Sequence, residues 1–575
     1  MNAPFVGSAG LASDRSYDRV LHFKKNHLTM ISGNKKEWET QKSYADRSNT
    51  MKSGNMNMVA THSVKDEDDK SIGFMVNGQF IYNETIKSGI YEIDNLAVQE
   101  NGEIREREAL LEVHYGDAVI RPAYKKIVQE NQFRRDVQKE FERWRKIGYA
   151  QVLQVDGPRQ VGKATELLKF AYKNYGHVIY VNLAMDRFGF TKIAKMPNML
   201  LGIADYCYRA NLPGYKDSRD TMLIIDEIQT SAEVYNSIRD LRRDLNCDIA
   251  VTGSYLGTIL GKNGFFLPAG TLAFIDMSAI SFKEFARIFK AEKLLEGIDL
   301  YGSGNQEHYD RLNKLYGIYR QIGGYPEVVK RYIKTKSIED SQLEIGNLLR
   351  IFKRESQNYF SQPREAEIFE SVYTSALEEM CHEKRGTGKG YLELISKIAK
   401  DNTSLIVNKD EVANAVVWLT YAGILCKCDL AVNGDIRNIS RSRRMYFSDC
   451  GLVAYLSKMT TLDESAIEGI LTETFVFNEL RLLFHHGIAE RKVIGSNVCF
   501  SVYGQYELDF MVADSNRVVY GIEVKTKGGN PLSLKVFIDN HLIDKGIVAK
   551  PTPGGHGDRF DTIPIYAVGC RFPYR

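Results

Sequence analysis

Short apolar runs alternate with longer amphipathic stretches between residues 150 and 277. The apolar runs have the length of strands, and the stretches between them are long enough for helices. This alternation predicts an α/β unit with a mostly parallel sheet, because parallel neighbours need a helical crossover between them. The five predicted strands read AQVLQVD, HVIYVNL, TMLIIDE, CDIAVTG and LAFIDM.

The pattern before this unit is different. Residues 1–71 are polar with few apolar runs, and we expect them to be partly disordered. Residues 72–120 have β-branched and aromatic runs between NG and SG turn signals, which predict a small β-rich module. Between residues 124 and 146, apolar positions recur at a spacing that indicates one charged helix with a single buried stripe.

After residue 280 the pattern is mainly helical as far as about residue 425. A hairpin-like stretch (429–447) and a helical stretch (464–486) follow. A second β-rich region completes the pattern, and its predicted strands read NVCFSVYG, YELDFMVA, VVYGIEVK and KGIVAKP.

The length of 575 residues favours three or four domains, because single cores stop growing near ~250–300 residues. The net charge of +3 neither requires nor excludes a nucleic-acid partner. The eight cysteines form no C-x-x-C pair, which argues for reduced thiols rather than a zinc site. The first residues lack the basic start and apolar run of a secretory signal, and no apolar stretch reaches the ~20 residues that a membrane-spanning helix needs. We therefore expect a cytoplasmic protein without a membrane partner.

Residues 157–165, GPRQVGKAT, lie directly between a predicted strand and a predicted helix. This is the G-x-x-x-x-G-K pattern of a phosphate-binding loop in the setting that the pattern requires. The two glycines allow the loop to wrap tightly, and the following helix directs its positive end at the phosphates. The lysine would neutralise the β- and γ-phosphates. We expect ATP to contact Gly157, Pro158, Arg159, Gln160, Val161, Gly162, Lys163, Ala164 and Thr165.

One position of the loop departs from the pattern. Ala164 stands where the motif has Ser or Thr, whose hydroxyl contacts Mg²⁺. Thr165 is the next residue, but on a helix it faces about 100° away. We therefore expect either that Thr165 or a water molecule holds Mg²⁺, or that ATP is bound and hydrolysed poorly.

Two carboxylates end the predicted strand TMLIIDE. Asp226 suits a contact to Mg²⁺, and Glu227 suits the orientation and deprotonation of the attacking water. The alternative is a strand that merely ends in acidic residues, but the pair follows the phosphate-binding loop at a suitable distance. The next strand would bring Thr252 or Ser254 toward the γ-phosphate as a polar sensor, although Thr-Gly-Ser is also a common strand-ending turn.

The ordered segments GPRQVGK, LIIDEIQ, AVTGSYLG, ISFKEF and IGGYPEVV resemble a large prokaryotic family. Its members join an AAA-type ATPase to a C-terminal domain of unknown function with a restriction-endonuclease-like core. Members commonly carry Thr after the loop lysine, and often Arg before the SF-x-EF motif, where this chain has Ala164 and Thr271. A trans-acting arginine could come from Arg239, Arg242 or Arg243, although arginines in this pattern are more typical of a solvated helix surface. The family also makes a homo-oligomer an expectation.

The resemblance covers about residues 120–575 and implies an α/β fold with several domains. We expect a polar, partly disordered N-terminus (1–71), a small β-rich module (72–120), a P-loop AAA-type ATPase domain (121–290), a helical lid or linker (291–387), a winged-helix-like region (388–460) and a C-terminal α/β restriction-endonuclease-like domain (461–575).

Charged residues at strand spacing suggest a second site near the C-terminus. Residues two apart on a strand share a face, so Glu523 lies beside Lys525 and Glu507 beside Asp509. Two antiparallel strands could then place Asp509 and Glu523 to hold Mg²⁺, with Lys525 activating water. Glu473 on the predicted helix adds a third carboxylate. This set resembles the PD-(D/E)xK nuclease core, and the alternative is an ion-pair network in a nuclease-like fold without activity.

Residues 388–447 have the pattern of a winged helix, with two helices around a turn and a basic hairpin. The hairpin could contact nucleic-acid backbone, or it could be a solvated hairpin used for packing between domains. Its arginines are Arg437, Arg441, Arg443 and Arg444.

The combined prediction is an ATPase that uses ATP and Mg²⁺ to control a C-terminal domain that binds or cuts DNA or RNA. The alternative is a nucleotide-switched regulatory protein, of the genome-defence or toxin-control kind, with weak hydrolysis and an inactive nuclease fold.

Overall fold

The computed structural model describes eight strands between residues 19 and 120, together with residues 133–572 apart from several gaps. The gaps lie at 148–150, 187, 211–215, 255–263, 267, 269, 357–362, 383–395, 397–408, 486–497 and 527–528.

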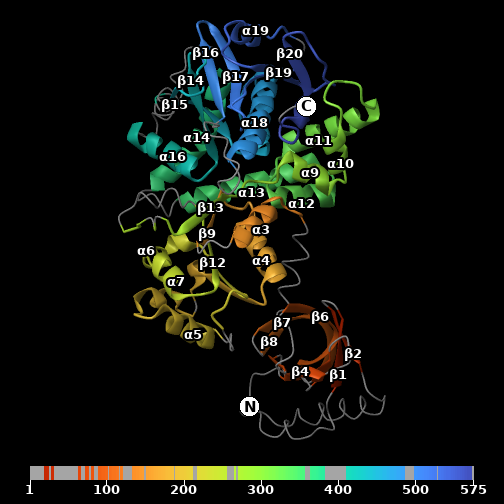
Figure 1. Cartoon of the computed structure of the whole chain (residues 1–575), viewed down its shortest axis with the longest axis vertical. Helices are drawn as coiled ribbons and strands as arrows, with labels where there is room; N and C mark the ends of the chain where they lie inside the picture. Colours follow the sequence, from red (N-terminus) through yellow and green to blue (C-terminus); the bar gives the residue numbers. More distant parts are fainter. Residues whose placement is uncertain are drawn as a thin grey trace.

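The N-terminal strands are β1 (Arg19–Lys24), β2 (His27–Ile31), β3 (His62–Lys65), β4 (Ser71–Val76), β5 (Gln79–Tyr82), β6 (Gly89–Glu100), β7 (Glu103–His114) and β8 (Asp117–Ile120). They close into a barrel in the order β1-β2-β6-β7-β8-β5-β4-β3 (Figure 1). The β-rich module, expected over residues 72–120, begins earlier, because three strands of the barrel precede residue 72. These strands are short, and β2 finds its partner β6 far along the chain, so local periodicity did not reveal them.

A five-stranded sheet lies at the centre of the next region. Its strands are β9 (Val152–Asp156), β10 (His177–Asn182), β11 (Thr221–Asp226), β12 (Asp248–Thr252) and β13 (Leu272–Asp276). The spatial order is β10-β11-β12-β9-β13, and every neighbouring pair is parallel. The predicted α/β unit with a parallel sheet is therefore confirmed. The strand that precedes the phosphate-binding loop, β9, lies inside the sheet and has a partner on each side.

The helices of this region are α3 (Val137–Ile147), α4 (Lys163–Asn174), α5 (Met199–Arg209), α6 (Ala232–Asn236) and α7 (Ile238–Asp244). Within the range 124–146 predicted as one helix, α3 covers residues from Val137, residues 133–136 are not helical, and residues 121–132 lie outside the described part of the chain. The backbone N–H of Asp136 donates to the Glu284 carboxylate (2.6 Å), which ties this residue to a segment distant in sequence instead of to a helical turn.

A helical layer follows the five-stranded sheet and lies between it and the C-terminal sheet (Figure 1). It contains α9 (Phe282–Ile288), α10 (Glu292–Gly297), α11 (Gln306–Ile322), α12 (Pro326–Thr335), α13 (Ile338–Ser356), α14 (Pro363–His382), α16 (Lys409–Tyr421) and α17 (Cys450–Ser457). The predicted helical character as far as about residue 425 agrees with this layer. The first predicted helix of the winged-helix-like region, near 392–400, lies almost wholly outside the described residues. Among the helices that the structure describes, none is both long and apolar enough to cross a membrane.

The C-terminal sheet contains β14 (Leu425–Val432), β15 (Ile439–Phe447), β16 (Cys499–Tyr503), β17 (Tyr506–Ala513), β18 (Val519–Val524), β19 (Lys545–Lys550) and β20 (Phe560–Pro564). Its order is β15-β14-β16-β17-β18-β19-β20, with β14 parallel to β16. The β14–β15 hairpin, predicted as the wing of a separate region, is therefore part of the same sheet as the predicted nuclease-like strands. The domain boundary that we expected at residues 460–461 divides strands that the fold joins.

Two helices cover opposite faces of the C-terminal sheet. Side chains of α18 (Glu464–His485) share one buried cluster with Phe510 and Ile522. Side chains of α19 (Leu532–Asp539) share a different cluster with Leu508 and Met511. The register of β17 against β16 shifts at this point, so that Leu508 and Phe510, which are two residues apart, enter different clusters.

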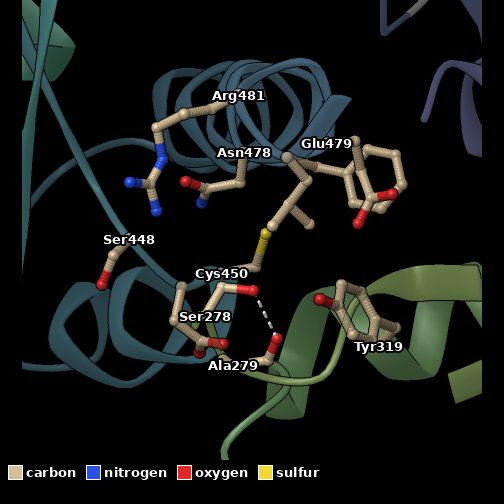
Figure 2. A pocket seen from close by; sticks show the side chains of 11 residues that line it. Ser278, Ala279, Tyr319, Ser448, Cys450, Asn478, Glu479 and Arg481 are labelled. Carbon is tan, nitrogen blue, oxygen red and sulfur yellow. Dashed lines mark hydrogen bonds between the residues drawn. The ribbon is translucent and has the colours of Figure 1, made fainter. Parts of the chain in front are cut away.

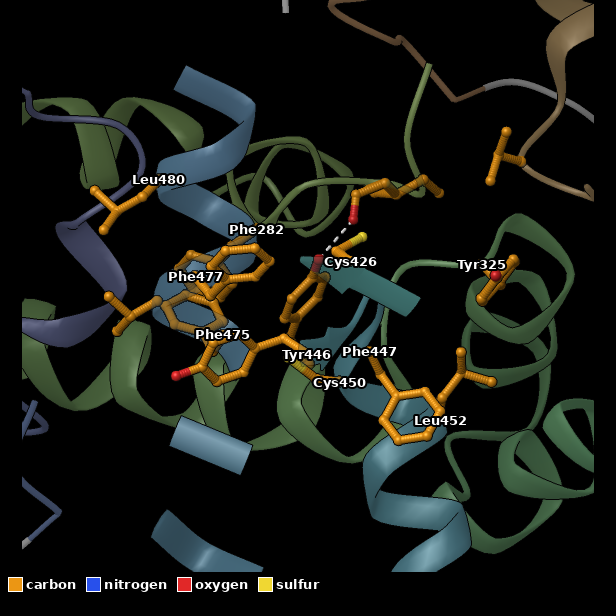
Figure 3. Close-up of a cluster of buried hydrophobic side chains, with 14 of the residues drawn as sticks. Phe282, Tyr325, Cys426, Tyr446, Phe447, Cys450, Leu452, Phe475, Phe477 and Leu480 are labelled. Carbon is orange, nitrogen blue, oxygen red and sulfur yellow. Dashed lines mark hydrogen bonds between the residues drawn. The ribbon is translucent and has the colours of Figure 1, made fainter. Parts of the chain in front are cut away.

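One buried apolar cluster extends from the five-stranded sheet to the C-terminal sheet. It includes Val155 of β9, Phe282 of α9, Phe475 of α18 and Phe510 of β17. Figure 3 shows its central aromatic part, where Phe282 and Phe475 pack with ring centroids 5.8 Å apart. Burial of such rings is a large apolar contribution, so the two sheets are held by a shared core rather than by a surface contact.

Candidate nucleotide-binding site

The loop between β9 and α4 adopts backbone conformations that only glycine accepts easily. Gly157 has a φ of +137°, and a Cβ at this position would lie 2.0 Å from the Met277 carbonyl oxygen. Gly162 has a φ of +93° and precedes the first residue of α4. No side chain caps α4, so the N–H groups of its first turn remain directed at the space enclosed by the loop. This arrangement fits the triphosphate of a nucleotide.

Lys163 is buried against the loop, with 8% of its surface exposed. Its ammonium donates to the carbonyl oxygens of Gly157 (2.9 Å) and Pro158 (2.8 Å). Burial lowers the pKa of Lys163 to about 8, although the carboxylates of Glu227 and Asp226 act in the opposite direction. Phosphate oxygens would provide stronger, charged acceptors for the same ammonium group.

Ala164 and Thr165 occupy the second and third positions of α4, and both are half-buried. The alanine offers no hydroxyl at the position where the motif contacts Mg²⁺. The residues that could hold Mg²⁺ here are therefore Asp226 and, from its different direction, Thr165.

Asp226 ends β11 at the same edge of the sheet as the loop. The Tyr180 hydroxyl of β10 donates to one carboxylate oxygen (2.6 Å), and the Glu227 N–H donates to the other (2.9 Å). Burial raises the pKa of Asp226, and the hydrogen bond from Tyr180 lowers it. No sequence motif marks Tyr180, and only the parallel pairing of β10 with β11 brings it to the site.

Glu227 occupies a left-handed conformation with a φ of +54°, which is uncommon for a residue with a side chain. Its carboxylate accepts a hydrogen bond from the Gln229 amide and lies 3.8 Å from an Arg159 guanidinium nitrogen. The carboxylate is partly exposed, and its contact with Arg159 places it beside the phosphate-binding loop. Such a group can orient and deprotonate a water molecule beside a γ-phosphate.

The two predicted sensor residues have different surroundings. Thr252 is fully buried, and its hydroxyl donates to the Val155 carbonyl of β9 (3.0 Å), so it connects neighbouring strands. Ser254 follows the end of β12 and is also buried.

Two of the candidate trans-acting arginines have local partners. Arg242 donates to the Leu245 and Cys247 carbonyls, and Arg243 pairs with Asp240 and Asp244.

Arg135 supports the loop from outside the motif. Its guanidinium donates to the carbonyl oxygens of Val161 (3.2 Å) and Ser278 (2.8 Å) and forms an ion pair with Glu284 (3.0 Å). Arg135 belongs to the charged stretch predicted as a helix with one apolar buried stripe, yet its own side chain is buried, with 5% of its surface exposed. One side chain thus joins the phosphate-binding loop, the residues after β13 and the start of α9.

The predicted C-terminal site brings its residues close together but engages each of them with protein groups. Asp509 accepts from the Val524 N–H (2.7 Å), and Glu473 accepts from the Tyr446 hydroxyl (3.2 Å). Glu523 accepts from the Leu534 N–H of α19 (3.2 Å) and pairs with Lys525 (2.7 Å). Burial and the neighbouring Glu473 carboxylate raise the pKa of Asp509. In the described part of the chain, no three His, Cys, Asp or Glu residues are grouped so as to hold a metal ion.

The arginines of the β14–β15 hairpin do not form one exposed basic face. Arg444 is 7% exposed, pairs with Glu507 and lies 4.3 Å from the centroid of the Phe500 ring. Arg437 is exposed and pairs with Asp435 (2.9 Å). The side chains of Arg441 and Arg443 lie outside the described residues.

A polar junction connects the helical layer to α18. Asn478, Glu479 and Arg481 of α18 line a small cavity of about 10 Å³. Figure 2 shows these side chains, with Tyr319 nearby. Glu479 is 4% exposed and accepts from the Phe282 N–H at the start of α9 (2.9 Å). Burial raises its pKa to about 7. The first residue of α9 is therefore hydrogen-bonded to a buried carboxyl group of α18.

Comparison with known families agrees with this geometry over part of the chain. Residues 149–286 match the family model described as an AAA domain, and residues 313–463 match a domain of unknown function (DUF8612). No curated protein matches the chain. The region that contains the loop is thus an AAA-type P-loop ATPase domain, as the sequence motifs predicted.

Several solved structures are similar to the chain at low identity. A Walker-type ATPase of Pyrococcus abyssi is 13% identical, with 57% of this chain and 97% of that chain covered and a TM-score of 0.34. The ORC2 protein of Aeropyrum pernix in ADPNP–ADP complexes is 13% identical, with 52% and 88% covered and a TM-score of 0.30. The RuvB Holliday junction branch migration motor of Thermotoga maritima is 16% identical, with 53% and 89% covered and a TM-score of 0.23.

Proposed function

We propose that this protein binds ATP with Mg²⁺ in the loop between β9 and α4, hydrolyses the γ-phosphate, and uses the bound nucleotide to control its C-terminal half. The observation that carries the proposal is the uncapped first turn of α4 beside the buried Lys163, opposite the carboxylates that end β11. Donors, a cation and two carboxylates then converge on one edge of a parallel sheet, where ligands of such sheets bind.

Each residue has a distinct task in this mechanism. The N–H groups of α4 and Lys163 would hold the β- and γ-phosphates, and Asp226 would hold Mg²⁺ directly or through water. When bound there, the metal would supply positive charge against the phosphate oxygens. Glu227 orients the attacking water and accepts its proton. Because Ala164 has no hydroxyl, we expect slow turnover and weak retention of Mg²⁺.

Control of the C-terminal half, the part of the chain after α9, is supported by two direct connections. The Phe282 N–H of α9 donates to Glu479 of α18 (2.9 Å). Arg159 of the loop pairs with Glu355 of α13 (2.6 Å). A displacement of the loop or of α9 would therefore be transmitted to helices of the C-terminal half.

For the C-terminal half, we propose nucleic-acid binding, with nuclease action at Asp509, Glu523, Lys525 and Glu473 as one form of it. A second candidate function, a nucleotide-switched regulator without cleavage, is favoured by one observation. The three carboxylates already accept hydrogen bonds from protein donors, and Glu523 is also paired with Lys525. Mg²⁺ would have to displace these partners before it could bind.

The test is Mg²⁺-dependent ATP hydrolysis by the full chain, with and without DNA, beside a Glu227→Gln variant. We expect Glu227→Gln to lower turnover by about 10²–10⁴-fold while ATP binding persists, because the amide cannot accept a proton. Glu233→Gln is the matched control, since Glu233 is an exposed acid that pairs with Lys195. Equal turnover in the wild type and in Glu227→Gln would remove the proposed role of Glu227.

The two candidate functions separate in a nicking assay with Mg²⁺ and supercoiled DNA. Cleavage that Asp509→Asn abolishes would support the nuclease. DNA binding that depends on ATP, with no cleavage by the wild type, would support the regulator.

A further inference from the structure

Arg159 lies between the candidate nucleotide site and the C-terminal half. One guanidinium nitrogen is 2.6 Å from a Glu355 oxygen in the last turn of α13, and another is 3.8 Å from Glu227. The three side chains are only 16–28% exposed. An ion pair in such partly buried surroundings is screened less by salt than a surface pair.

A second contact joins the same loop to the C-terminal half. Gly423 lies in the turn between α16 and β14 and has a φ of +71°. A Cβ at this position would lie 3.0 Å from the Pro158 ring, so the backbone of the turn packs directly on the loop. Two successive loop residues, Pro158 and Arg159, therefore contact segments that belong to the C-terminal half.

These contacts make Arg159 a shared group. Glu355 holds the guanidinium on the α13 side, whereas Glu227 and a phosphate oxygen would attract it into the site. Phosphate is a strong, bidentate acceptor for arginine, so a bound triphosphate competes with Glu355 for the same N–H groups. We propose that Arg159 is a positioning residue that exchanges Glu355 for the nucleotide, so that nucleotide binding releases the last turn of α13.

The proposed exchange rests on the proposed ATP binding. It couples ATP affinity to the attachment of α13, so that each affects the other. If ATP weakens the attachment of α13, then loss of that attachment must strengthen ATP binding by the same factor. The contact also gives the C-terminal half a route to the proposed general base, because Arg159 lies beside both Glu227 and Glu355.

The test uses the full chain with Glu355→Gln, which keeps the side-chain size and removes the charge. We expect ATP to bind this variant about two- to fivefold more tightly than the wild type, the range typical of one partly exposed ion pair. Hydrogen exchange in the last turn of α13 should rise on ATP addition in the wild type. In Glu355→Gln, hydrogen exchange in this turn should already be faster than in the wild type when ATP is absent. Glu339→Gln removes the same charge from the exposed first turn of α13 and should behave as wild type.

Lys163→Ala separates this inference from the proposed function. If the wild type and Lys163→Ala bind ATP equally, the proposed function fails and the inference fails with it. If ATP binding requires Lys163 but exchange in the last turn of α13 is the same with and without ATP, only the inference is overturned. Unchanged ATP affinity in Glu355→Gln would overturn it as well.

Discussion

Individual residues of the candidate site are held in conformations that the rest of the fold must enforce. Glu227 has a left-handed backbone, and Gln160 in the loop has one too, with a φ of +65°. Such conformations cost of order 1–3 kcal/mol each and cluster at functional sites. Their presence at the ends of β9 and β11 agrees with a site in which the position of one carboxylate matters more than local stability.

The position of Ala164 gives a sharp prediction about Mg²⁺. Ala164→Thr restores the hydroxyl of the motif, so we expect faster ATP hydrolysis and a lower Mg²⁺ concentration for half-maximal rate. Ala164→Val has nearly the same shape without the hydroxyl and should not show this gain. Titration of hydrolysis with Mg²⁺ measures both. An equal response of the two variants would show that side-chain volume, rather than a metal ligand, limits the site.

Tyr180 gives a prediction about pH. Its hydrogen bond lowers the pKa of Asp226, against the effect of burial, so Tyr180→Phe should raise that pKa further. The acidic limb of the pH profile of hydrolysis should then move to higher pH, because Asp226 must be ionised to hold Mg²⁺. Tyr208→Phe is the control, since Tyr208 is 83% exposed. A profile unchanged in Tyr180→Phe would mean that Asp226 does not limit the reaction.

At the scale of elements, the phosphate-binding loop depends on segments that lie on both sides of it in sequence. Arg135 connects the segment before α3 to the loop and to α9, where Glu284 also completes the capping box with Ser281. The loop is therefore supported by a buried ion pair and not only by its own strand and helix.

Arg135→Ala should destabilise the protein by about 3–5 kcal/mol, because it leaves the Glu284 carboxylate buried without its cation. Thermal unfolding measures the loss as a lower Tm. Arg134→Ala is the matched control, since Arg134 is exposed. The loss should be smaller when Arg135→Ala is made in a Glu284→Gln background. Additive effects of the two changes would contradict the coupling.

Periodicity predicted the elements well wherever strand and helix patterns were strong. The five apolar runs became β9 to β13, and the strands of the second β-rich region became β16 to β19. The errors have a common cause, because they concern partners distant in sequence. The pairing of β14 with β16, the early strands of the barrel and the non-helical residues 133–136 all depend on such contacts. At the site, motifs identified the loop and the acid pair, whereas Tyr180 and Arg135 belong to no motif.

At the scale of the whole molecule, the two sheets share one core and a small number of buried polar contacts. Glu479 makes one of these contacts. It joins α9 to α18, and the nearby Glu284 carboxylate adds to the effect of burial on its pKa.

The ionisation of Glu479 should make stability depend on pH. Its pKa is near 4.5 in the unfolded chain and about 7 in the fold, so the folded state binds the proton more tightly. The resulting stabilisation is fully present below pH ~4.5 and is lost as the pH rises through ~7, by up to about 3 kcal/mol. Glu479→Gln should remove this part of the decline in Tm. Glu464→Gln, an exposed change on the same helix, should keep it. Identical slopes for all three proteins would contradict the assignment.

The pairing of β14 with β16 also has a consequence for biosynthesis. Val432 and Val502 pair in parallel, and the chain between them must leave the ribosome before β14 gains this neighbour. At ~5–20 residues per second, the interval lasts several seconds. During that time β14 has only the β15 hairpin as a partner, and its other edge is open to strands of a second nascent chain. Newly made molecules would then be most sensitive to crowding and chaperone supply in this interval, before the sheet of the C-terminal half is complete.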